Sequence, residues 1–215
     1  QNITAVYLPD SVREIGMSCF EGCSSLEKVK FGEGLILIDD LAFSGSAITS
    51  VKLPDSLSVV NGFFGCSKLT SVDFGNYVTK IEASAFEYCT SLRQVYIPGT
   101  VFEIENFAFG NCTSLEYAKV YGYDLMAIGA FAFINCTSLT EADLGNTKIS
   151  SVSNSLFSGC TSLEKVSLPD SVGYIWYGAF EGCSSLKNID LPEGLRMLYS
   201  HSFYATGLEK IAIPA

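Results

Sequence analysis

The sequence has little charge overall and especially little positive charge. Of its 215 residues, 13 are Lys or Arg and 23 are Asp or Glu, which gives a formal net charge of −10. Nucleic acid and anionic membrane surfaces recruit proteins through clustered Lys and Arg, so this composition argues against both as partners. The chain also lacks the run of about 18 to 20 apolar residues that a membrane-spanning helix needs, so we expect no membrane insertion.

The chain has few of the residue sets that carry catalysis. Its single histidine, His201, has no nucleophile at a matching repeat position, and nucleophilic catalysis needs a base beside the nucleophile. Cys19 and Cys23 are only two ligands, too few for a zinc site. Acidic pairs such as Glu103 and Glu105 fit a solvated surface better than a glycosidase centre. No phosphate-binding glycine loop or EF-hand spacing occurs. We therefore predict no enzymatic activity, no cofactor and no metal.

The sequence does contain a repeat that extends over nearly its whole length. A segment that opens on Leu or Ile and continues with apolar residues at its fourth and sixth positions restarts every 21 to 24 residues. The restarts are Ile3, Leu26, Ile48, Leu69, Leu92, Leu115, Leu139, Leu163, Leu186 and Leu208. A period in this range with leucine-type anchors is typical of a leucine-rich-repeat solenoid.

The first six residues of each repeat have the pattern of a strand. The fourth and sixth positions are apolar and alternate with polar neighbours, as in Leu92 to Ile97. All six prolines follow the sixth position directly, and proline has no N–H for a strand ladder. Glycine, which also weakens a strand, takes this place in repeats two, four and seven, so only repeat six differs, with Tyr121. We predict ten such strands in one parallel sheet.

The second half of each repeat predicts a turn that closes on phenylalanine and ends in a left-handed residue. The phenylalanines share one offset, which predicts a buried aromatic column: Phe20, Phe43, Phe63 or Phe64, Phe86, Phe109, Phe133, Phe157, Phe180 and Phe203. Gly or Asn stands two residues later in seven of nine repeats, as expected for a left-handed helix end. Tyr88 and Ala205 occupy this position in the other two. They are either strained there, or their coils end differently.

Seven cysteines also share one offset. They are Cys23, Cys66, Cys89, Cys112, Cys136, Cys160 and Cys183. Disulfide-rich folds are small domains without a sufficient core, and this chain has ample apolar residues for a core. Adjacent cysteines in a stack could in principle form disulfides, but small, reduced and buried thiols are the interpretation that we favour.

The segment Ala-Phe-x-Gly-Cys-Ser/Thr-Ser-Leu distinguishes this repeat from other leucine-rich repeats. The full pattern, Leu-x-x-Val-x-Leu-Pro-x-x-Val-x-x-Ile-x-x-x-Ala-Phe-x-x-Cys, resembles the BspA-type, or treponemal-type, family. We predict an α/β repeat fold: a right-handed solenoid of about nine coils, with a parallel sheet on the concave face and short helical or 3₁₀ turns opposite. Residues 1–215 are expected to be one solenoid segment of a longer chain. The resemblance implies a secreted or cell-surface protein that adheres to host proteins or other cells, and no shared catalytic residues.

Two aromatic groups are candidate contact sites on the outside of this solenoid. The first surrounds the irregular sixth repeat and consists of Tyr96, Phe102, Tyr117, Tyr121 and Tyr123. The second consists of Tyr174, Trp176, Tyr177 and Tyr199, in which Trp176 and Tyr199 share an offset and should stack. Exposed tyrosines dominate many protein interfaces, whereas a Trp–Tyr pair can also bind sugar.

These observations predict a non-enzymatic recognition or adhesion module that binds an extracellular or host protein through the first aromatic group. Two alternatives stay open. One is a glycan-binding module that uses Trp176 and Tyr199, although the same rings could instead cover the end of the solenoid. The other is a structural spacer with no ligand of its own.

Overall fold

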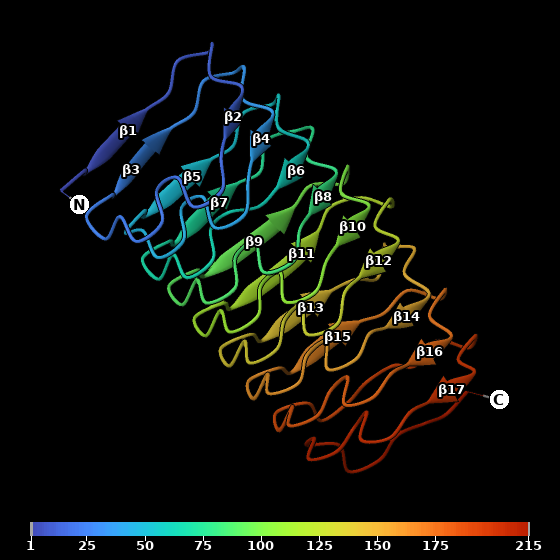
Figure 1. The fold of residues 1–215 in the computed structure, drawn as a ribbon. Coiled ribbons are helices and arrows are strands. Elements are labelled where there is room, and N and C mark those ends of the chain that lie inside the picture. The colour runs from blue at the N-terminus through green and yellow to red at the C-terminus, as the bar shows by residue number, and fades with distance from the viewer. Residues whose placement is uncertain (1, 215) are drawn as a thin grey trace.

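The protein is an elongated stack of coils built from short parallel strands (Figure 1). A computed structural model describes residues 2–214, so the first and last residues of the segment lie outside it. Two rows of strands run side by side along the stack, and the chain passes from one end to the other without returning. We number the coils from the sequence restarts, so that coil six spans residues 115–138. No helix occurs in residues 2–214, and none of them therefore lies in a helix that could cross a membrane.

Each row of strands forms one face of the stack. The first face contains β1 (Ala5–Tyr7), β3 (Lys28–Lys30), β5 (Ser50–Lys52), β7 (Ser71–Asp73), β9 (Gln94–Ile97), β11 (Tyr117–Val120), β13 (Glu141–Asp143) and β15 (Lys165–Ser167). The second face contains β2 (Glu14–Ile15), β4 (Leu37–Ile38), β6 (Val59–Val60), β8 (Lys80–Ile81), β10 (Glu103–Ile104), β12 (Ala127–Ile128), β14 (Ser151–Val152), β16 (Tyr174–Ile175) and β17 (Met197–Leu198). The sequence pattern had predicted the first face only.

Strand pairing follows the repeat. Every pair is parallel and joins equivalent positions of successive coils, as Ala118 with Ala142 and Ile104 with Ile128. In the middle of the stack the inward residues, such as Val95 and Ala118, are buried, whereas their outward neighbours are exposed or half-buried. Because one residue of slip would turn the apolar side chains outward, the alternation fixes this register.

The predicted helical turns are wrong, and a third backbone ladder takes their place. In coil one, the amides of Ser18, Phe20 and Gly22 donate to carbonyls of coil two, and the same pattern recurs along the stack. Two residues per turn have a left-handed backbone, such as Ser18 (φ 54°) and Gly22 (φ 65°). In an α-helix, the amides bond to carbonyls of the same segment. Here they bond to the next coil, so these turns are not helical.

The left-handed position before the cysteine offset is confirmed in all nine coils. Tyr88 (φ 60°) and Ala205 (φ 55°) adopt it as well, so these two residues are strained rather than differently folded. The second left-handed column was not anticipated, because it contains few glycines. Its members are Ser18, Leu41, Ser84, Phe107, Phe131, Ser155, Gly178 and His201.

The predicted phenylalanine column is present and lies at the centre of the core. Nine rings, from Phe20 to Phe203, stack with centroids 5.2 to 5.7 Å apart and with planes within 15° of parallel. Phe63 is the member from coil three, while the half-buried Phe64 packs edge-on against Tyr88. Each ring contacts only the coils beside it, so the core extends by repetition.

The prediction of ten strands on the first face is wrong for the last two repeats. In coils two to eight, from Glu27 to Glu164, the amide of the second residue donates to the carbonyl of the second residue of the preceding coil. Lys187, the second residue of coil nine, makes no such bond. Residues 188–190 and 210–212 are accordingly not strands. Asn188 and Asp190 are of types that are depleted in strands, which weakens pairing there.

Candidate binding surfaces

The cysteine column is structural in character. All seven of its members are buried, whereas Cys19, outside the column, is exposed. Six thiols donate to a phenylalanine carbonyl of the preceding coil at 3.1 to 3.3 Å, as Cys112 does to Phe86. Burial raises the pKa of Cys66 to about 11 and that of Cys112 to about 12. Cys66 and Cys112 are therefore protonated donors rather than nucleophiles.

The polar residues named as catalytic or metal-site candidates have other partners in the structure. No cluster of three His, Cys, Asp or Glu side chains could hold a metal ion in residues 2–214. The hydroxyl of Ser200 bonds to Nδ1 of His201, and the imidazole lies edge-on against Tyr204. Glu103 and Glu105 both pair with Lys80, and hydrogen bonding to Glu105 raises the pKa of this lysine. These acids are thus neutralised by a surface cation.

Three of the predicted contact tyrosines meet on the first face at coils five and six. The ring of Tyr96 on β9 lies 6.1 Å from that of Tyr117 and 6.0 Å from that of Tyr121. Tyr121 is 51% exposed and Tyr96 is 45% exposed, while Tyr117 is half-buried. We call Tyr96, Tyr117 and Tyr121 the tyrosine patch.

Two glycines hold Tyr121 in this position. The chain leaves β11 through Gly122, whose φ of 113° is available mainly to glycine. Gly122 packs on Gly99 of the preceding coil so closely that a Cβ on Gly122 would lie 2.5 Å from the Gly99 Cα. A Cβ on Gly99 would in turn meet the Tyr121 carbonyl oxygen. The backbone contact therefore turns Tyr121 outward.

The charges beside the tyrosine patch are paired. Lys119 lies 5.7 Å from the Tyr121 ring centroid and 3.2 Å from a carboxylate oxygen of Asp143. Lys165 pairs with Glu141 at 2.6 Å. The hydrogen bonds to these carboxylates raise the pKa of both lysines. The two acids of β13, Glu141 and Asp143, are therefore balanced by lysines, and the patch has a nearly neutral border.

The remaining two predicted residues of this group are exposed but lie outside the ring contacts. Phe102 directly precedes β10, and no ring contact in residues 2–214 includes Phe102 or Tyr123. The Phe102 carbonyl accepts the amide of Met126, a residue that is 64% exposed and that sequence reasoning missed. Met126 precedes Phe133 by seven residues, as Phe102 precedes Phe109, and this shared spacing was the signal that could have found it.

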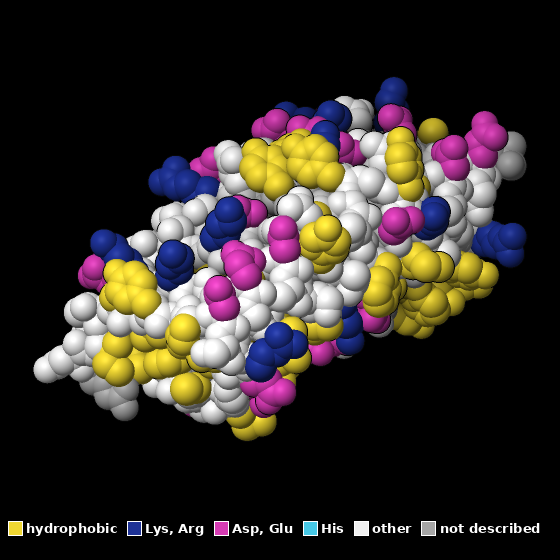
Figure 2. Space-filling view, turned by 90° about the horizontal axis from the view of Figure 1, so that it is seen from above, with side chains coloured by type: hydrophobic (Ala, Val, Ile, Leu, Met, Phe, Trp, Pro, Cys, Tyr) yellow, Lys and Arg dark blue, Asp and Glu magenta, His cyan; other side chains and the backbone are white. Residues whose placement is uncertain are grey.

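Another ring pair was missed in the turns of the same two coils. Phe107 and Phe131 stack at 4.7 Å with planes 11° apart, and both are half-buried. Both have left-handed backbones. The large hydrophobic side chains form separate groups, between which charged side chains are interspersed, as the face in Figure 2 shows.

The second predicted aromatic group is brought together completely. Trp176 stacks on Tyr199 at 4.2 Å with planes 13° apart, and both Tyr174 and Tyr177 contact Trp176. Tyr177 is exposed, and the other three rings are half-buried. The Trp176–Tyr199 stack occupies one face of each ring, which leaves less ring surface for a sugar.

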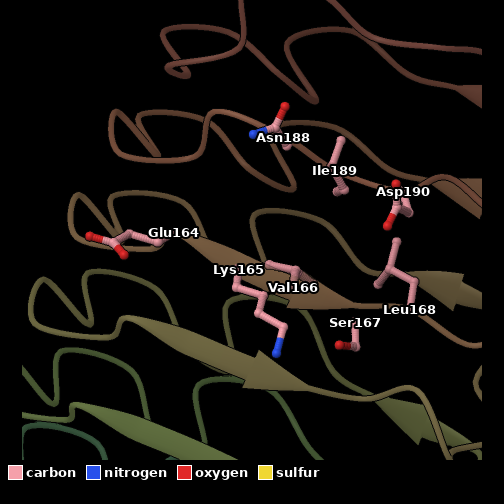
Figure 3. A pocket seen from close by; sticks show the side chains of 8 residues that line it. All are labelled: Glu164, Lys165, Val166, Ser167, Leu168, Asn188, Ile189 and Asp190. Atoms are coloured by element: carbon pink, nitrogen blue, oxygen red, sulfur yellow. The ribbon is translucent and has the colours of Figure 1, made fainter.

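A cleft opens on the first face between coils eight and nine, where strand pairing ends. It has a volume of about 500 Å³ and is lined by residues 164–168 on one side and by residues 188–190 on the other. Figure 3 shows Leu168 and Asp190 facing each other across it. Sequence reasoning missed this cleft, because the apolar pattern continues through Ile189.

The chain was compared with known proteins. A family model of the BspA type leucine rich repeat region matches residues 1–116 and 103–215, with six copies. No curated protein matches the chain. Among solved structures, a leucine-rich repeat protein from Bacteroides ovatus ATCC 8483 is 27% identical with a TM-score of 0.55; the match covers 96% of this chain and 65% of that one.

Two further structures have the same architecture. A leucine rich cell surface protein from Faecalibacterium prausnitzii A2-165 is 27% identical with a TM-score of 0.63, over 96% of this chain and 59% of that one. The T. pallidum leucine rich repeat protein is 26% identical with a TM-score of 0.66, over 87% and 80%. The chain thus spans about two thirds or less of the first two proteins. Since the family model matches both halves of the sequence, the chain belongs to the BspA-type leucine-rich-repeat family.

Proposed function

We propose that this chain is a non-enzymatic recognition module of a secreted or cell-surface protein, and that it binds an extracellular protein through the tyrosine patch. The observation that carries the proposal is the grouping of Tyr96, Tyr117 and Tyr121 on an otherwise regular face. Tyrosine offers a large apolar ring and a hydroxyl at low entropic cost, which suits a protein contact. A relative described as a cell surface protein supports the location.

Substitution of the patch tests this proposal. We expect Tyr117→Ala/Tyr121→Ala to weaken binding to immobilised extracellular-matrix glycoproteins at least tenfold, because central aromatic residues dominate interface energies. Surface plasmon resonance measures the affinity, and circular dichroism checks the fold. Tyr77→Ala is the matched control, since Tyr77 is 62% exposed and has no ring contact. Equal loss of binding in both variants would reject the patch as the contact site.

The second candidate is glycan binding by the cluster of Tyr174, Trp176, Tyr177 and Tyr199. Its support is the contiguous stack around Trp176. On this proposal, Trp176→Ala/Tyr199→Ala removes binding on a glycan array, and free oligosaccharide competes with the immobilised ligand. If neither double variant changes any interaction, the module is a spacer that positions other parts of its protein.

A further inference from the structure

The cleft between coils eight and nine opens where the second-position backbone hydrogen bonds of the first face end. Up to Glu164, a second-position amide joins every coil to the one before it, even at the junctions of β3 with β5 and of β7 with β9, where the strands themselves do not pair. Beyond β15 the first face divides, while the second face continues through the pairing of β16 with β17. The turn ladder also continues, because Phe180 donates to Ser202 and Gly182 donates to Tyr204. The two coils are therefore joined along two sides and open along the third.

The division turns β15 into an edge strand. β15 pairs with β13 on one side, and on its other side it pairs with no strand of residues 2–214. An edge strand presents a row of backbone N–H and C=O groups that can pair with another extended chain. Proteins use such edges to bind peptides, because the backbone bonds supply affinity and side-chain pockets supply specificity.

The lining of the cleft defines the chemistry of an occupant. Val166, Leu168 and Ile189 supply apolar surface. Lys165 extends toward β13, where it pairs with Glu141, so its charge is already neutralised (Figure 3). Glu164 and Asp190 have no ion pair within the described chain. The cleft thus combines three apolar side chains with polar ones, and two of its acids, Glu164 and Asp190, have no cationic partner in the described chain.

From this arrangement we propose that the cleft binds an extended peptide segment of a partner protein, which pairs with the edge of β15 and carries alternating apolar and basic side chains. About five residues in extended form, at roughly 3.3 Å each, match residues 164–168. Apolar side chains lie toward Leu168 and Ile189, and basic side chains lie near Glu164 and Asp190. This site is independent of the tyrosine patch and of the function proposed for it.

The probe is a fluorescein-labelled peptide with the sequence Leu-Glu-Lys-Val-Lys-Phe, which is residues 26–31 of this chain. In coil two this segment contains β3, a strand of the first face, so its sequence is suited to pairing with a strand such as β15. It also carries two lysines. Fluorescence anisotropy should show saturable binding. A peptide of the same sequence with N-methylated backbone amides cannot donate to the edge, and we expect it to bind at least tenfold more weakly.

A reversible lock tests the location. Ser167 and Asp190 occupy the same offset in coils eight and nine, so a disulfide in Ser167→Cys/Asp190→Cys would hold the two segments together. A Cys19→Ser background removes the exposed thiol. We expect no peptide binding when the lock is oxidised and normal binding when it is reduced, so the reduced sample controls for folding. Ser50→Cys/Ser71→Cys, across the paired strands β5 and β7, is the matched control and should bind in both states.

Three results would overturn the proposal. The first is equal binding by the oxidised and reduced lock, which would place the peptide elsewhere. The second is equal binding of the N-methylated peptide, which would exclude strand pairing. The third is slow hydrogen exchange at the amides of residues 187–191 in the peptide-free protein, which would show that this segment itself covers β15. Tyr117→Ala/Tyr121→Ala should bind the peptide normally, so failure of this site is separable from failure of the tyrosine patch.

Discussion

Coils six and seven have the same length and the same phenylalanine and cysteine in their interiors, but they differ in what they expose. Each buries one phenylalanine and one cysteine at equivalent positions, Phe133 with Cys136 and Phe157 with Cys160. Coil six exposes Tyr121, Tyr123 and Met126, whereas coil seven (residues 139–162) exposes no large hydrophobic side chain. Because both coils fold alike, the exposed residues of coil six are not required by the fold. The difference separates the residues that build the rod from those that are available for recognition.

Removal of a core ring should have the largest effect and should be the same in both coils. We expect Phe133→Ala and Phe157→Ala each to lower the free energy of unfolding by about 3 to 5 kcal/mol, because each removes a fully buried ring between two others. Urea unfolding followed by circular dichroism measures both. If the two variants lose free energies of unfolding that differ by more than the experimental error, the two ring positions are not equivalent.

Alkaline pH should reveal the thiol column that passes through both coils. Burial raises the pKa of Cys112 from 9.0 to about 12, so the folded protein retains a proton that the unfolded chain loses. Stability from the neutral thiol is complete below pH 9 and is lost as the pH rises toward 12. Above pH 9, the free energy of unfolding should fall by about 1.4 kcal/mol per pH unit for such a thiol.

The variant Cys112→Ala isolates this contribution from other titrating groups. Urea unfolding of the wild type and of this variant, at intervals between pH 7 and pH 11, should give a shallower decline for the variant. Parallel declines would mean that the thiol ionises as readily in the folded protein as in the unfolded chain.

The ion pair between the two coils should have the smallest effect. Lys119 of coil six and Asp143 of coil seven are 3.2 Å apart on the first face. We expect Lys119→Asp to lower Tm slightly, by placing two carboxylates together, and the double variant Lys119→Asp/Asp143→Lys to restore it. Differential scanning calorimetry at low and high salt measures the change, which should shrink as salt is added. A swap that fails to restore Tm would show that the site depends on more than paired charge.

The interior of the rod was predictable because each buried position recurs nine or ten times in one chain. The offsets of Phe109, Cys112 and Leu115 are visible without an alignment, and they led directly to the stacked column. The turns were mispredicted as helical because Gly and Asn mark a left-handed residue without specifying what precedes it. The second left-handed column, with Leu41 and Phe131, has no such marker, and neighbouring coils impose its conformation.

The surface was predictable only where neighbouring coils carry aromatic residues at equal or alternating offsets. Equal offsets placed Trp176 on Tyr199, and strand alternation placed Tyr96 beside Tyr117. Phe102 did not join the tyrosines, because the chain turns to the second face before it. The cleft was invisible, since the loss of backbone bonds at Lys187 has no signature in the apolar pattern.

The column of left-handed residues has a consequence for protein engineering. Ser18 and Ser155, whose small side chains make no ring contact, each hold a conformation that costs a residue with a Cβ about 1 to 2 kcal/mol, whereas Gly178 holds it at no steric cost. Glycine gives back roughly 0.5 to 1 kcal/mol in the entropy of the unfolded chain, so each exchange to glycine leaves a small net gain. These two positions lie in coils one and seven, in the turns, away from the tyrosine patch and the cleft. The free energy of unfolding can therefore be raised by substitutions in separate coils, one coil at a time.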